Sequence, residues 1–173
     1  MPAAIVQTLL GIFRNRPFDS PRTLIDPLNE DTDPILELER TAAERPDDAH
    51  ALIALANAYW LAGRGPEPVG ELASRAIAAD PGNRAGWHLW ALSESHPRDR
   101  VARWQQVSTR FPDDDLARAN VADNAAAVAG AEKNHEALEL AIRTYEELLV
   151  TAQNREQREA LDSALQSLRG WRF

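Results

Sequence analysis

The chain has 173 residues, which suits one compact domain or one short array of repeats. It contains no cysteine, so disulfides, thiolate catalysis and thiolate metal sites are all excluded. Its 27 acidic and 19 basic side chains give a formal charge of −8, which disfavours binding to nucleic-acid phosphates. We therefore expect a cytoplasmic protein with no nucleic-acid partner.

Residues 1–32 differ from the rest of the chain. Apolar residues between positions 3 and 13 predict a short helix with Ile5, Leu9 and Phe13 on one face. Prolines and aspartates then predict irregular structure up to residue 32. The apolar stretch lacks a preceding positive charge and is too short to span a bilayer, so we expect no secretory signal and no stable membrane insertion. Its apolar face suggests docking in the chain's own groove, or self-association of two copies through Ile5, Leu9 and Phe13.

From residue 33 onward the pattern indicates helices. Asp33 before Pro34 predicts a helix start, because the carboxylate accepts free backbone N–H groups and proline fits the first helical position. The run Asp113 to Asp115 is interpreted as a helix cap rather than a cation site. Asn154 and Gln157 form a capping-box pattern that opens a last helix over residues 154–169. Because hairpin and alternation signals are missing, we expect an all-α fold with one domain over residues 33–173.

An internal repeat organises this domain. Three prolines are spaced 35 and 31 residues apart, and each is followed by a polar pair and a helix: Pro46, Pro81 and Pro112. A small residue lies ten positions after each proline, at Ala56, Ala91 and Ala122. Small side chains at a fixed position let two antiparallel helices approach closely. The repeat therefore predicts helical hairpins that pack at these alanines.

These residues resemble the tetratricopeptide repeat (TPR) family over residues 34–152. The resemblance is strongest in the unit 46–81, where the family pattern appears as Leu52, Leu55, Ala56, Tyr59 and Gly63, then Ala76 and Pro81. It implies a right-handed superhelical solenoid of about three helical hairpins. Helix 154–169 is then the C-terminal cap that terminal repeats need.

The resemblance also implies a binding site. In this family ligands lie on the concave face made by the first helix of each hairpin. The matching positions of this chain are His50, Ile53, Asn57, Trp60, His88, Leu92, Ser95 and Asp123. Their mixed, weakly charged character favours a helix or peptide of a partner protein. We therefore expect a protein-interaction module or scaffold.

Two other functions stay open. The first helix suggests a membrane-surface protein, although the acidic composition opposes anionic lipids. An enzyme with an unrecognised site would draw on His88, Glu94 and Asp123. No metal, nucleotide or nucleophile motif is present, so we expect no enzyme, cofactor or metal site.

Three groups of side chains have competing interpretations. The arginines at 98, 100, 103 and 110 either grip an acidic peptide or form a solvated face paired with local acids, and the second is favoured. Asn120, Asp123 and Asn124 share a helix face, and either line the groove or bond a neighbouring helix. Trp87 and Trp90 occupy packing positions of the repeat and are expected in the core, whereas Trp60 is not.

Overall fold

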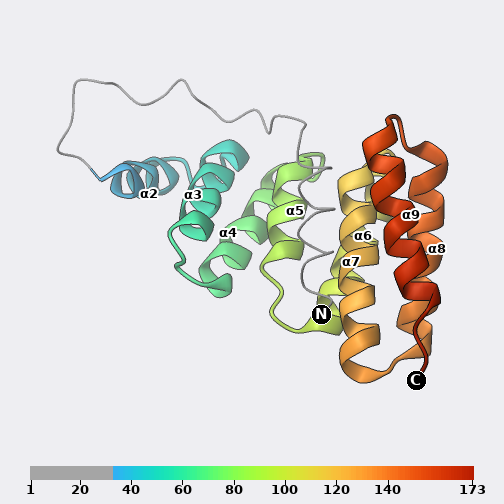
Figure 1. Cartoon of the computed structure of the whole chain (residues 1–173). Coiled ribbons are helices and arrows are strands. Elements are labelled where there is room, and N and C mark those ends of the chain that lie inside the picture. Colours follow the sequence, from blue (N-terminus) through green and yellow to red (C-terminus); the bar gives the residue numbers. More distant parts are fainter. Residues whose placement is uncertain (1–32) are drawn as a thin grey trace. The chain divides into compact units, whose positions relative to one another are not determined.

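The computed structural model describes residues 33–173, and the predicted N-terminal helix with Ile5, Leu9 and Phe13 lies outside these residues. The described residues form helices and no strand, which confirms the all-α class (Figure 1). In chain order the helices are α2 (Pro34–Glu44), α3 (Ala49–Leu61), α4 (Pro66–Ala79), α5 (Arg84–Leu92), α6 (Pro97–Arg110), α7 (Asp115–Glu132), α8 (His135–Thr151) and α9 (Arg155–Arg169).

The described residues pack as two compact units. Residues 33–95 hold α2 to α5, and residues 96–173 hold α6 to α9. Within each unit consecutive helices pack against each other, and α3 also contacts α5. The connections within each unit are two to four residues long, which makes consecutive helices antiparallel neighbours. The range that the sequence treats as one domain thus divides at residue 95.

Side-chain caps start the helices where the sequence predicts. The amide of Ile35 donates to Asp33 Oδ1 at 3.0 Å, directly before Pro34. Asp114, within the predicted acidic cap, accepts from the amide of Ala117 at 3.0 Å. At the last helix the amide of Gln157 donates to Asn154 Oδ1 at 2.9 Å. These bonds satisfy N–H groups that a helix start leaves without partners.

Each unit has its own apolar core. The first is built around residues of α3 and α4, among them Leu52, Ala56, Val69 and Ala76. The second combines α7, α8 and α9 and consists largely of alanine and leucine. The three alanines of the repeat, Ala56, Ala91 and Ala122, are fully buried. Their burial agrees with the close helix packing that the repeat predicts at these positions.

The tryptophans depart from the expected core. Trp87 and Trp90 are only half-buried and meet edge to face, with ring centroids 5.7 Å apart. The indole N–H of Trp87 donates to the carbonyl of Pro81 at 3.0 Å, which holds this ring beside the loop before α5. The prediction that both lie in the core is therefore only partly right. Trp104 in α6 is the tryptophan that is almost completely enclosed.

Helix α9 has one apolar and one polar side. Helix α9 buries Leu161, Leu165 and Leu168, while polar residues such as Asp162 and Gln166 face outward.

Lys133 follows the last residue of α7 as its C-cap, and its backbone adopts a left-handed conformation with φ 53° and ψ 42°. Among residues 33–173 no helix is both long and apolar enough to cross a membrane.

Candidate functional site

Helices α3 and α5 of the unit 33–95 carry six of the eight predicted site residues, and Ser95 follows the end of α5. These two helices contact each other directly, and α4 packs against both. On α3, His50 and Trp60 are exposed, Asn57 is half-buried and Ile53 is 8% exposed. On α5, Leu92 is half-buried and His88 is 7% exposed. Two of the predicted site residues therefore belong mainly to the packing of the unit.

Ser95 lies beyond the helix on which the repeat places it. Helix α5 ends at Leu92, and the hydroxyl of Ser93 donates to the carbonyl of Trp90 at 3.0 Å. Serine commonly bonds nearby carbonyls in this way at helix ends. Pro97 then begins α6, so only four residues join the two helices. The short α5 also accounts for the spacing of 31 residues between Pro81 and Pro112.

Exposed apolar side chains gather on the first hairpin of this unit. Leu36 of α2 is 58% exposed, and at the end of α3 Trp60 is 42% and Leu61 is 84% exposed. The hydroxyl of Tyr59 donates to Glu39 at 2.7 Å, which joins the middle of α2 to the end of α3. The sequence indicated that Trp60 lies outside the packing positions of the repeat. It gave no reason to separate Leu36 and Leu61 from core leucines.

Asp123, the eighth predicted residue, lies inside the unit 96–173. Its side chain is 1% exposed and accepts a hydrogen bond from the hydroxyl of Tyr145 on α8. Asn120 and Asn124 instead donate to carbonyls of their own helix, at Leu116 and Asn120. Of the two interpretations, Asp123 follows the one in which it bonds a neighbouring helix. A catalytic site that includes Asp123 would depend on a carboxyl group that is closed to solvent.

One member of the arginine group, Arg98, forms a local ion pair. Arg98 Nε donates to Glu132 Oε2 at 2.8 Å, joining α6 to the end of α7. This bond keeps the pKa of Glu132 below its usual value. The pairing agrees with the favoured interpretation of a solvated face that meets local acids.

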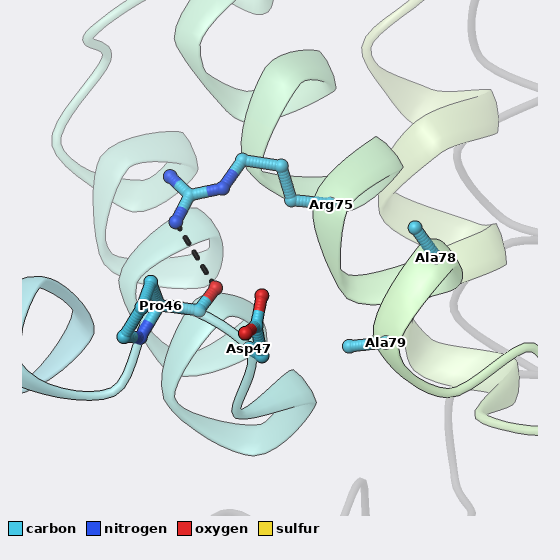
Figure 2. Close-up of a pocket in the computed structure, with 5 residues that line it drawn as sticks. All are labelled: Pro46, Asp47, Arg75, Ala78 and Ala79. Atoms are coloured by element: carbon cyan, nitrogen blue, oxygen red, sulfur yellow. Dashed lines mark hydrogen bonds between the residues drawn. The ribbon is translucent and has the colours of Figure 1, made fainter.

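One open hollow of about 310 Å³ lies beside α4, lined by Pro46, Asp47, Arg75, Ala78 and Ala79 (Figure 2). Arg75 donates to the carbonyl of Pro46 at 3.1 Å, so this side chain ties α4 to the turn before α3. Asp47 and Arg75 are both exposed, and no further polar side chain lines the hollow. None of its residues belongs to the predicted groove.

In the described range no three His, Asp or Glu side chains come together as possible metal ligands. Comparison of the chain with protein-family models, with curated proteins and with solved structures gives no match.

Proposed function

We propose that this chain is a TPR-like protein-interaction module of the cytoplasm, built as a right-handed solenoid, which holds a helix or peptide of a partner protein. The binding surface is the face of α3 and α5. The observation that carries this proposal is Trp60, whose large side chain is 42% exposed at the end of α3. Tryptophan is among the residues that contribute most to protein interfaces.

The neighbours of Trp60 suit a helical ligand. Asn57 lies one turn earlier on α3 and is half-buried, so its amide is available to orient a backbone or polar side chain. Leu61 and Leu36 extend the apolar surface at the same end of the hairpin. An amphipathic helix places apolar anchors at similar intervals along one side.

The charge of the two units indicates which polar side chains a partner helix should carry. Residues 33–95 contain ten acidic and five basic side chains, whereas residues 96–173 contain thirteen and eleven. The larger acidic excess thus lies in the unit with the exposed apolar cluster. Because a net field steers opposite charges during association, a partner helix with a basic polar side is favoured.

A displayed library of helical peptides, selected against the full chain, tests the proposal. We expect basic amphipathic sequences to be enriched, and Trp60→Ala to weaken their binding at least tenfold, as loss of a central aromatic anchor does. Val150→Ala is the matched control, because Val150 is also an exposed large apolar residue but lies on α8. Peptides that bind wild type and Trp60→Ala equally would contradict the assignment of this face.

A further inference from the structure

A single carboxyl group is enclosed between α7 and α8. Asp123 is 1% exposed and Tyr145 is 2% exposed. The hydroxyl of Tyr145 donates to Asp123 Oδ1, and no described residue forms a hydrogen bond with Asp123 Oδ2. The apolar core of this unit includes five residues of the same two helices: Ala119, Ala122, Ala126, Ala141 and Leu148. An ionised Asp123 would therefore have a single hydrogen-bond donor, Tyr145, beside an apolar core.

Within residues 33–173, the influences on the pKa of Asp123 include no positively charged side chain. Charged side chains of the helices that pack on α7 are Arg98, Asp99, Arg100, Arg103 and Arg110 on α6, and Glu136, Glu139, Arg143, Glu146 and Glu147 on α8. Burial raises the pKa of Asp123 to about 7, and the bond from Tyr145 is the one influence that opposes it. Removing water from a charge without supplying a counter-charge disfavours the charged form.

We propose that the α7–α8 hairpin is a proton-operated latch, in which Asp123 is an uncharged carboxylic acid while the hairpin is closed. Loss of the Asp123 proton to solvent leaves an anion with a single donor between the helices. The packing of α7 on α8 then loosens. This inference concerns the unit 96–173 and does not depend on the proposed function.

The direction of the pH effect follows from the raised pKa. A carboxyl that holds its proton more tightly in the folded state stabilises that state at low pH. The contribution is complete below the unfolded pKa of about 4 and is lost as pH rises through about 7. Between about pH 5.5 and about pH 8.5 the folding equilibrium constant should fall roughly 30-fold through this group alone.

Urea unfolding of the full chain at these two pH values tests the latch. The informative quantity is the difference between wild type and Asp123→Asn, because this difference cancels the pH dependence of the other groups. Asparagine keeps the shape and the acceptor for Tyr145, and it should remove the roughly 30-fold component. Asp162→Asn, at an exposed position on α9, serves as the control and should leave it in place.

A second measurement covers the case in which Asp123→Asn does not fold. Carbon NMR of the side-chain carboxyls in wild type should show that Asp123 titrates near pH 7. A titration midpoint of Asp123 near pH 4 would overturn the proposal. So would a variant Asp123→Asn that keeps the full pH dependence of wild type.

Discussion

The indole ring of Trp171 lies directly on Gly130, across the turn that joins α7 to α8. A Cβ atom at Gly130 would stand 3.1 Å from Cη2 and 3.3 Å from Cζ3 of this ring. Phe173 continues the contact, with its ring 6.0 Å from that of Trp171 and 5.2 Å from that of His135. The last residues of the chain therefore fold back over the end of α7.

The substitution Gly130→Ala measures this contact. Alanine in a helix is more favourable than glycine by roughly 1 kcal/mol, but here its methyl group would displace the indole ring. We expect Gly130→Ala to stabilise the variant Trp171→Ala by more than it stabilises wild type. The difference should be about 0.5 kcal/mol or larger in a double-mutant cycle read by urea unfolding. Equal effects in both backgrounds would show that the ring does not rest on Gly130.

The fully buried alanine of the third hairpin should not tolerate a larger side chain. Ala122→Leu adds three carbons at a position with no exposed surface, and overpacking of this kind costs about 1 to 3 kcal/mol. Ala127 lies on the same helix but is exposed, so Ala127→Leu is the matched control and should change the free energy of unfolding by less than about 0.5 kcal/mol. Comparable losses in the two variants would contradict close packing at Ala122.

Lys133 should be improved by glycine. Its backbone is left-handed, a conformation in which a side chain is unfavourable and glycine is the usual residue at the end of a helix. We expect Lys133→Gly to raise the free energy of unfolding by up to about 1 kcal/mol. Lys133→Ala removes the same charge but keeps a Cβ, so it should give no such gain in thermal unfolding. A stabilisation shared by both variants would trace the effect to charge.

The two tyrosines should ionise at different points in an alkaline titration. Burial and the neighbouring Asp123 raise the pKa of Tyr145, and the bond to Glu39 raises the pKa of Tyr59. A raised pKa in the folded state means that stability is lost as pH climbs above the unfolded value of about 10. Tyrosinate absorbance from Tyr145 should therefore appear only together with loss of helical circular dichroism. The variant Tyr145→Phe should lack the rise in tyrosinate absorbance that accompanies loss of helical circular dichroism. If that rise persists in the variant, it does not come from Tyr145.

Local features of the fold could be predicted from the sequence because they depend on neighbouring residues. The caps at Asp33 and Asn154 follow from short-range hydrogen bonding, and the burial of Ala56 follows from a repeated small residue at a fixed spacing. The end of α5 was harder to predict. Ser93 and Pro97 end this helix earlier than the periodicity of its apolar residues indicates. Ser95 was consequently placed one turn too far along a helix.

The candidate site was less predictable because it depends on distant partners. Helical periodicity puts Asp123 on a polar face, but its partner Tyr145 lies 22 residues later on another helix. Exposure of Leu36 and Leu61 has a similar origin, because the same residue type packs or faces solvent according to which helix covers it. The exposure of Trp60 could be predicted because this residue falls outside the packing positions of the repeat.

Lys133 has a practical consequence beyond its backbone conformation, because it is the only lysine in the chain. A reagent that reacts with side-chain amines can therefore attach at one defined and exposed location, the turn between α7 and α8. A fluorophore placed there would sit next to the hairpin that holds Asp123. It would report the separation of those two helices in solution without any engineered cysteine.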